Sequence, residues 1–248
     1  MPIRGLLYGV VCYAIFLGTF LYAIGFLGDA WVPRTVDRGG PVGSTGTALL
    51  IDLVLLSIFA LQHSVMARQG FKRAWTAIVP EPVERATYVL ASSLAMILLF
   101  WQWRPLPKVI WDLHSPAVRM PIWILFGAGW GLVLLSTFLI NHFELFGLLQ
   151  VWRHAKGHVA EPVRFREPFL YRFVRHPLYV GWIVVFFAVP TMTAGHLLFS
   201  VMATGYILVA IRLEERDLRA LHPEYAEYSQ RVSMLIPGMG RNPRELET

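Results

Sequence analysis

The chain has 248 residues, of which 56% are hydrophobic and only 15% are charged, and its formal net charge is +6. This composition is too apolar and too poor in charge for an ordinary soluble domain. We therefore expect an integral membrane protein with an all-α fold, a polytopic bundle of membrane-spanning helices.

Five apolar runs approach the ~20 residues that a helix needs to cross a bilayer. They cover residues 6–28, 47–66, 86–103, 121–140 and 178–211. The first four runs contain no charge except Asp52, and each predicts one span. The last run is too long for one span and is interrupted at residues 190–196, so it predicts a tight helical hairpin. The sequence thus indicates six spans, with five as the alternative.

The first apolar run is not typical of a cleavable signal peptide. It exceeds the usual ~7–15 residues, and no small-residue cleavage site follows it before residues 29–31. The only cysteine of the chain, Cys12, lies within this run. A single cysteine excludes an internal disulfide and a metal site made of cysteines, and we predict no metal. A cysteine buried in an apolar span is also expected to be unreactive.

Basic residues are distributed unevenly among the segments that join the spans. With the N-terminus inside and six spans, only five of the 22 Lys and Arg fall on the outer side. These five are Arg34, Arg38, Arg104, Lys108 and Arg119. Because basic residues accumulate on the cytoplasmic side of membrane proteins, both termini are predicted to be cytoplasmic. The basic excess then reflects topology and contact with membrane lipids, and we predict no nucleic-acid partner.

The whole chain, residues 1–248, is expected to form a single integral membrane domain. Residues 1–141 contain the four N-terminal spans, residues 142–176 form a cytoplasmic interfacial segment, and residues 177–248 form the hairpin and a C-terminal tail. The interfacial segment begins with mixed aromatic and polar residues, as an interfacial helix does.

Polar side chains gather at the predicted cytoplasmic ends of the spans. These clusters are Gln62-His63-Ser64 with Arg68, Glu84-Arg85 with Tyr88, Asn141-His142 with Glu144, residues 175–179, and residues 212–217. Polar groups at a membrane boundary are costly, and they mark functional sites. Five separate segments therefore place hydrogen-bonding groups at one membrane face, where a charged cytosolic molecule can reach them.

The C-terminal clusters contain an ordered set of motifs. The set reads Arg175-His176-Pro177-x-Tyr179-x-Gly181, then Glu214-Glu215-x-x-Leu218, then Tyr225-x-x-Tyr228. It resembles the C-terminal signature of the isoprenylcysteine carboxyl methyltransferases, which the phospholipid N-methyltransferases share. The resemblance covers residues 170–238, about a quarter of the chain. Each motif is weak alone, but the ordered set around an apolar hairpin is specific.

The N-terminal clusters narrow the resemblance. The motifs are Gln62-His63-Ser64-x-Met66-Ala67-Arg68, Pro80-x-Pro82-x-Glu84-Arg85-x-Thr87-Tyr88, and Asn141-His142-Phe143-Glu144-Leu145-Phe146-Gly147. They are similar to those of the bacterial membrane-bound methanethiol S-methyltransferases. This resemblance implies S-adenosylmethionine as methyl donor, a small thiol as acceptor, dimethyl sulfide as product, a cofactor site on the cytoplasmic face and a place in the bacterial inner membrane.

The resemblance also implies which residues bind S-adenosylmethionine. They are Arg175, His176, Leu178, Tyr179, Gly181, Glu214, Glu215, Tyr225 and Tyr228. Carboxylates suit the ribose diol and the amino group of this cofactor, whereas amides and basic side chains suit its carboxylate. Adjacent residues point about 100° apart on a helix. We therefore expect one of Glu214 and Glu215 to face the cofactor and the other to face solvent or an arginine.

Three local patterns agree with these roles. Tyr225 and Tyr228 are three residues apart, so they share a helix face and suit adenine or the ribose edge. Pro177 disfavours helix at the residue before it, which frees helix N-terminal amides for an anionic group. Gly181, one turn later, allows a ligand or a neighbouring helix to approach closely.

Methylation of a thiol requires the thiolate, so the site needs a group that takes the proton. Candidates in the family-specific motifs are His63, His142 and Glu144, with Asp52 deeper in the membrane. We favour His63 as the base or as a thiol-orienting group, because histidine titrates near neutral pH. The residues predicted to bind the substrate are Gln62, Ser64, Arg68 and Tyr88.

Other interpretations compete with these roles. Arg172 and Arg175 are alternatively anchors for lipid headgroups. Glu214 and Glu215 are alternatively part of a solvated helix face. Tyr225 and Tyr228 are alternatively aromatic residues at the membrane interface. A haem-binding membrane protein with His63, His142 and His176 as axial ligands is an alternative from another class. A closer alternative is a methyltransferase that acts on an isoprenylcysteine or a lipid. No obligate protein partner is inferred.

Overall fold

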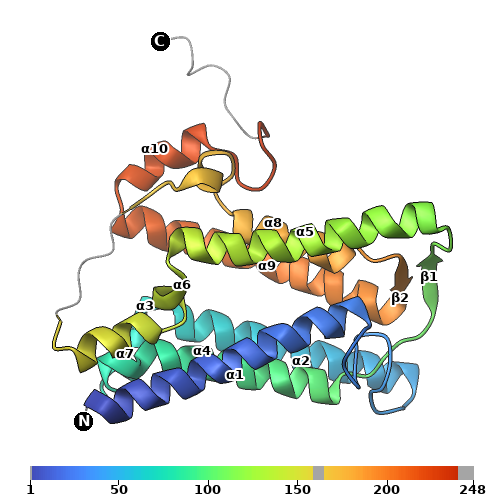
Figure 1. Cartoon of the computed structure of the whole chain (residues 1–248), viewed down its shortest axis with the longest axis horizontal. Helices are drawn as coiled ribbons and strands as arrows, with labels where there is room; N and C mark the ends of the chain where they lie inside the picture. The colour runs from blue at the N-terminus through green and yellow to red at the C-terminus, as the bar shows by residue number, and fades with distance from the viewer. Residues whose placement is uncertain (1, 159–164, 240–248) are drawn as a thin grey trace.

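A computed structural model describes residues 2–158 and 165–239. The long helices are α1 (Pro2–Gly28), α2 (Thr45–Ala67), α4 (Glu81–Gln102), α5 (Pro116–Ile140) and α9 (Ala194–Leu221). The shorter helices are α3 (Gln69–Trp75), α6 (His142–Leu145), α7 (Leu148–Ala155), α8 (Pro177–Phe187), α10 (Glu224–Arg231) and the 3-10 helix η1 (Phe169–Arg172). Two short strands, β1 (Val109–Asp112) and β2 (Thr191–Thr193), complete the structure (Figure 1).

Five helices, α1, α2, α4, α5 and α9, are long and apolar enough to cross a membrane. This confirms the membrane helix bundle, and each of the first four apolar runs falls within one helix, except that Trp103 at the end of the third run is the C-cap of α4. The fifth run is divided where the sequence indicated, because α8 ends at Phe187 and α9 begins at Ala194. The 11 residues of α8 extend only about 16 Å, roughly half of the apolar thickness of a bilayer. The sixth span therefore remains a prediction.

Local sequence sets where several of these helices begin. Ser44 caps α2, because its side-chain oxygen accepts a hydrogen bond from the Thr47 amide over 3.2 Å. Thr193 caps α9 in the same way through the His196 amide at 3.1 Å. Such caps satisfy amides that have no partner within the helix. α8 begins at Pro177, whose missing amide proton is not needed at a first helical position.

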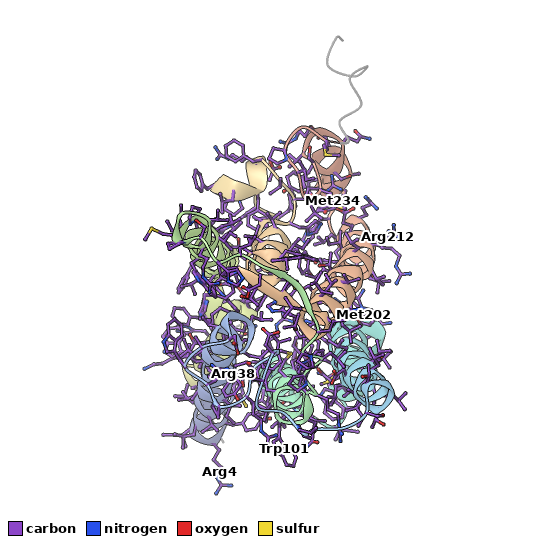
Figure 2. The ribbon with its side chains drawn as sticks, turned by 90° about the vertical axis from the view of Figure 1, so that its right-hand side faces the viewer. Arg4, Arg38, Trp101, Met202, Arg212 and Met234 are labelled. Carbon is purple, nitrogen blue, oxygen red and sulfur yellow. The ribbon has the colours of Figure 1, made fainter. Side chains whose placement is uncertain are left out.

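The long helices form two layers. α4 packs between α1 and α2 in an N-terminal layer, whereas α5 packs along α8 and α8 contacts α9 in a C-terminal layer. Figure 1 shows the N-terminal layer in blue to green below the C-terminal layer. Figure 2 views the same two layers from the end that carries the strands, with Trp101 of α4 in one layer and Arg212 of α9 in the other. α2 and α9 are in contact, so they connect the layers.

The strands are a departure from the purely all-α prediction. β1 and β2 pair in an antiparallel two-stranded sheet at the end of the bundle shown on the right of Figure 1. The Trp111 indole nitrogen donates to the Val189 carbonyl over 3.2 Å, and the Thr191 hydroxyl donates to Asp112 over 2.8 Å. The sheet joins two segments about 80 residues apart in sequence, so no local sequence pattern predicted that these strands would pair.

The opposite end of the bundle gathers the predicted polar clusters. The C-terminal ends of α2, α5 and α9 and the N-terminal ends of α4 and α8 lie on the left of Figure 1, away from the strands. Each of these ends carries one of the five clusters. The expectation that the clusters share one end of the bundle therefore holds in the structure.

Candidate active site

A buried carboxylate organises the C-terminal motifs. Glu215 is only 6% exposed, and its Oε1 accepts a hydrogen bond from the Arg175 Nε over 2.7 Å. The His176 Nε2 lies 3.0 Å from the same oxygen, and the Arg219 guanidinium donates to Oε2 over 3.0 Å. We call Arg175, His176, Glu215 and Arg219 the Glu215 cluster. In it both carboxylate oxygens of Glu215 are used by the protein's own side chains.

The Glu215 cluster also holds the C-terminal segment of the described chain. Arg175 Nη1 donates to the carbonyl of Ser229 over 2.8 Å and to that of Val232. The backbone amides of Arg175 and His176 donate to the carbonyls of Ser233 and Met234, over 2.8 Å and 3.2 Å. The residues around Val232 are thereby fixed beside the start of α8.

Glu214 points away from this cluster. Its Oε2 accepts a hydrogen bond from the Tyr179 hydroxyl over 2.9 Å, and its side chain is partly exposed. No second hydrogen-bond partner for Glu214 occurs in residues 2–158 and 165–239. The two neighbouring glutamates therefore differ, since Glu215 faces two arginines while one carboxylate oxygen of Glu214 has no hydrogen-bond partner within the described residues.

The α10 tyrosines are buried rather than displayed on an open face. Tyr225 and Tyr228 are 2% and 3% exposed, and their rings meet edge-on with centroids 5.5 Å apart. The Tyr228 hydroxyl donates to the Tyr171 carbonyl over 2.6 Å, whereas the buried Tyr225 hydroxyl lies near Glu215 but makes no close hydrogen bond within the described residues. Burial, and secondarily Glu215, raises the pKa of Tyr225, so this phenol stays protonated and able to donate.

Gly181 and Leu178, the other two residues of α8 that were predicted to bind the cofactor, differ in their surroundings. A Cβ added to Gly181 would lie 2.8 Å from the Val133 side chain and 2.9 Å from the Gly129 carbonyl. Gly181 therefore allows α8 to pack closely against α5, which is the neighbouring-helix use of a small residue. Leu178 is partly buried and makes no polar contact.

A second polar group lies between α2 and α4. The His63 Nε2 is 2.9 Å from the Tyr88 hydroxyl, and its Nδ1 is 3.2 Å from the Ser92 hydroxyl. The imidazole stacks on Phe59 with centroids 5.2 Å apart. The Arg85 guanidinium carbon lies 5.5 Å from the centre of the Tyr88 ring. We call His63, Tyr88 and Ser92 the His63 group.

Further contacts connect α2, the helix that carries His63, to α9. Arg68 Nη1 forms an ion pair with Asp217 over 2.8 Å, and the Ser64 hydroxyl donates to the Tyr206 oxygen over 3.3 Å. Gln62 is used locally, because its amide nitrogen lies 3.2 Å from the Met66 sulfur. The helix that carries Glu214 is thereby bonded to the helix that carries His63.

His142 and Glu144, the other two candidate bases, lie in separate surroundings. The His142 ring nitrogens are each 2.8 Å from a hydroxyl, that of Tyr13 and that of Thr137, and burial lowers the pKa of His142. Glu144 accepts a hydrogen bond from the Asn141 amide over 2.8 Å. None of these partners belongs to the His63 group, so the structure does not bring the three candidate bases together.

Asp52 lies toward the end of the bundle that carries the strands. It is fully buried, and its Oδ1 accepts a hydrogen bond from the Arg104 amide over 2.9 Å. Asp52 precedes His63 by eleven residues, about 16 Å along α2. Its contact ties α2 to the end of α4, which is a packing role.

Sequence reasoning missed Ser92 and Tyr206, and it placed Asp217 in a polar cluster without identifying its partner. Ser92 follows Tyr88 by four residues and so shares its helix face, a spacing that could have revealed it. Tyr206 is a polar residue within an apolar run, but an isolated tyrosine there is also common in membrane helices. The partnership of Asp217 with Arg68 spans 149 residues and left no sequence pattern.

The chain is thus a bundle of membrane-length helices with two polar groups at one end, carried by helices that are bonded to each other. Polar groups placed in this way at a membrane boundary are typical of the functional sites of integral membrane proteins. Neither family models nor solved structures match the chain. Curated relatives do, and the methanethiol S-methyltransferase of Mycobacterium tuberculosis is 56% identical over 235 residues, covering 94% of this chain and 95% of the relative. The methanethiol S-methyltransferase of Crocosphaera subtropica is 53% identical over 237 residues, covering 95% and 92%. Rat Nurim is 31% identical over 212 residues, covering 82% and 78%.

The chain therefore belongs to the methanethiol S-methyltransferase family, and it is a methyltransferase. This confirms the family that the sequence motifs indicated. It also favours the methyltransferase interpretation over the haem-binding one.

Proposed function

We propose that this protein transfers the methyl group of S-adenosylmethionine to methanethiol, forming dimethyl sulfide by in-line displacement at the cytoplasmic membrane face. One observation carries the proposal. α9 bears Glu214, which is bonded to Tyr179. The same helix bears Tyr206, which is bonded to Ser64 of α2 and whose ring contacts the His63 ring. A carboxylate for the donor and a histidine for the acceptor thus lie on connected elements at one end of the bundle.

The proposal includes the topology that the charge distribution favours. α8 and α9 serve as the arms of a hairpin and complete six membrane segments within one integral domain, residues 1–248. Both termini face the cytoplasm of a bacterium, and the protein resides in the inner membrane with lipid around its apolar helix faces. Support comes from the 17 Lys and Arg that this topology places inside, against five outside.

The residues at the C-terminal motifs suit the cofactor. Glu214 offers a carboxylate oxygen to an amino group or a ribose diol. The buried Tyr225 hydroxyl, which makes no close hydrogen bond within the described residues, is a donor available beside Glu215. Arg175 and His176 act indirectly, because Glu215 and the backbone carbonyls occupy the Nε and Nη1 atoms of Arg175 and the Nε2 atom of His176. Their proposed work is to fix α8 and the segment near Val232 around the cofactor.

The His63 group suits the acceptor. When bound, the cofactor supplies a methyl carbon attached to a positively charged sulfur, and the thiolate form of the acceptor is the nucleophile for that carbon. His63 takes the thiol proton, while Tyr88 and Ser92 orient its ring. Charge disappears when thiolate and sulfonium become two thioethers, so a water-poor site between helices does not oppose the reaction. His142 and Glu144 are held by other partners and are the second choice for the base.

The test of this function is product formation by the purified protein in lipid nanodiscs. With S-adenosylmethionine and methanethiol we expect dimethyl sulfide in the headspace, measured by gas chromatography, in proportion to the S-adenosylhomocysteine formed. The same protein is offered an isoprenylcysteine analogue and phosphatidylethanolamine. Preferential methylation of either larger acceptor would refute the small-thiol assignment.

Glu214 provides the test of the donor site. Replacing it with Gln keeps its size but removes the charge, so we expect S-adenosylmethionine to bind about 10–100-fold more weakly, the loss of one charge-assisted hydrogen bond. Isothermal titration measures the affinity. The matched control is Glu224→Gln, which changes an exposed glutamate on α10. Equal affinities of the two variants would show that the cofactor binds elsewhere.

A further inference from the structure

Tyr206 is a residue of the C-terminal layer that lies beside the His63 group. The Ser64 hydroxyl donates a hydrogen bond to the Tyr206 oxygen over 3.3 Å. The Tyr206 ring meets the rings of Phe59 and His63 edge-on, with centroids 6.2 Å and 6.4 Å away. α9 therefore places one phenol against α2, next to the histidine proposed as the base.

The position of Tyr206 along α9 also relates it to the donor side. Glu214 follows it by eight residues, about 12 Å along the helix and about 80° around it. Asp217 follows by eleven, which returns to within about 20° of the Tyr206 direction, and it pairs with Arg68 of α2. Tyr206 thus shares a helix with Glu214 and Asp217 and lies beside His63.

The hydroxyl of Tyr206 is incompletely used. Its oxygen accepts the hydrogen bond from Ser64, but no acceptor for its own hydrogen occurs among residues 2–158 and 165–239. A phenol is a good donor to an anionic acceptor. The charged and titratable side chains around it are His63 and Arg68 of α2, Tyr88 of α4, Tyr179 of α8 and Glu214 of α9. None of them accepts that hydrogen.

We propose that the Tyr206 hydroxyl donates its hydrogen bond to the sulfur of the acceptor thiol and thereby fixes the line of attack. The inference rests on the proposed thiol methylation. The thiol gives its proton to His63, and a sulfur electron pair forms the new bond to the methyl carbon. The bond from that carbon to the sulfonium breaks, and its electrons stay on the departing sulfur. Two neutral thioethers result, and His63 later releases the proton to solvent.

A hydrogen bond to the thiolate favours the charged reactant more than the transition state, in which the charge is disappearing. The benefit of Tyr206 is therefore expected in binding, ionising and aligning the thiol. It should show in the KM for methanethiol and in kcat/KM below the pKa of the thiol. At higher pH the thiol ionises without help, so the benefit should decrease.

The decisive variant is Tyr206→Phe, which removes the hydroxyl and keeps the ring that packs on Phe59 and His63. We expect kcat/KM for methanethiol to fall about 10–100-fold at pH 7, chiefly through KM, with the affinity for S-adenosylmethionine unchanged. The loss should shrink as the pH is raised. The matched control is Thr204→Val, which removes another hydroxyl of α9, one with no hydrogen-bond partner in the described chain. It should retain the parent's kinetics.

Each other outcome has a definite meaning. If Tyr206→Phe matches an active parent in kcat/KM, or if it loses affinity for S-adenosylmethionine, the role of Tyr206 at the thiol is refuted while the proposed function stands. If the loss is the same at every pH, Tyr206 does not assist ionisation, and the proposal fails on that count. If the parent binds S-adenosylmethionine but forms no dimethyl sulfide, the proposed function fails, and the role of Tyr206 fails with it.

Discussion

Replacing His63 with Ala is expected to lower the turnover of methanethiol by about 10²–10⁴-fold at neutral pH, the usual cost of removing a general base. The variant should still bind S-adenosylmethionine like the parent, because His63 contacts Tyr88 and Ser92 rather than any residue of the Glu215 cluster. Turnover by headspace chromatography and affinity by titration calorimetry measure the two effects separately.

The pH dependence of the His63→Ala variant distinguishes a base from a packing residue. Without a base the rate follows the fraction of methanethiol that is already ionised, which rises about tenfold per pH unit below the thiol pKa. The deficit should therefore narrow steadily as the pH increases. A pH-independent loss would instead indicate that the imidazole only supports Tyr88 and Phe59.

Two further histidine variants complete this experiment. His154→Ala alters an exposed residue of α7 and should behave like the parent. His142→Ala removes a buried ring that contacts Tyr13 and Thr137, so it should affect stability more than the pH profile. A pH-dependent loss in His142→Ala together with full activity in His63→Ala would transfer the role of base to His142.

The arrangement of the helices was largely predictable, because a bilayer imposes length and apolarity on each span. Four apolar runs became four helices, and the interruption at residues 190–196 coincided with the division between α8 and α9. What the sequence could not reveal was that α8 ends at Phe187, since residues 188–189, which precede the interruption, are also apolar. Hydropathy measures partition into lipid and is insensitive to where the backbone leaves the helix.

The sequence predicted which residues form the site better than it predicted the contacts between them. The spacing of Glu214 and Glu215 predicted that they diverge, and the structure shows that Glu215 is the one that faces arginines. Which of the two does so depends on the rotation of α9 against α8, a tertiary property. The tyrosines of α10 illustrate the same limit, because periodicity placed them on one face without showing that the face is buried.

The second large effect is expected from Glu215→Ala, and its primary consequence is a loss of folding stability. Glu215→Ala would leave Arg175, whose side chain is 11% exposed, and the buried His176 without their shared carboxylate. Breaking a buried ion pair from one side typically costs about 3–5 kcal/mol, because the remaining charge stays buried without compensation. We expect a clearly lower midpoint of thermal unfolding in detergent.

Two further variants, Glu224→Ala and Glu215→Gln, test whether the loss of stability comes from the ion pairs of Glu215. Glu224→Ala removes an exposed glutamate of α10 and should leave the midpoint unchanged. Glu215→Gln keeps an acceptor oxygen for Arg175, so its midpoint should fall between those of the parent and Glu215→Ala. If Glu215→Ala unfolds like the parent, the ion pairs of the Glu215 cluster contribute nothing to stability.

The Glu215→Ala variant should also lose cofactor affinity, but for an indirect reason. Arg175 donates to the carbonyls of Ser229 and Val232, so a displaced guanidinium releases the segment that follows α10. Amide hydrogen exchange should therefore accelerate at residues 229–234 in the variant even without cofactor, whereas Glu214→Gln should leave exchange there unchanged. Slow exchange at these amides combined with lost affinity would contradict this view, and it would mean that Glu215 contacts the cofactor directly.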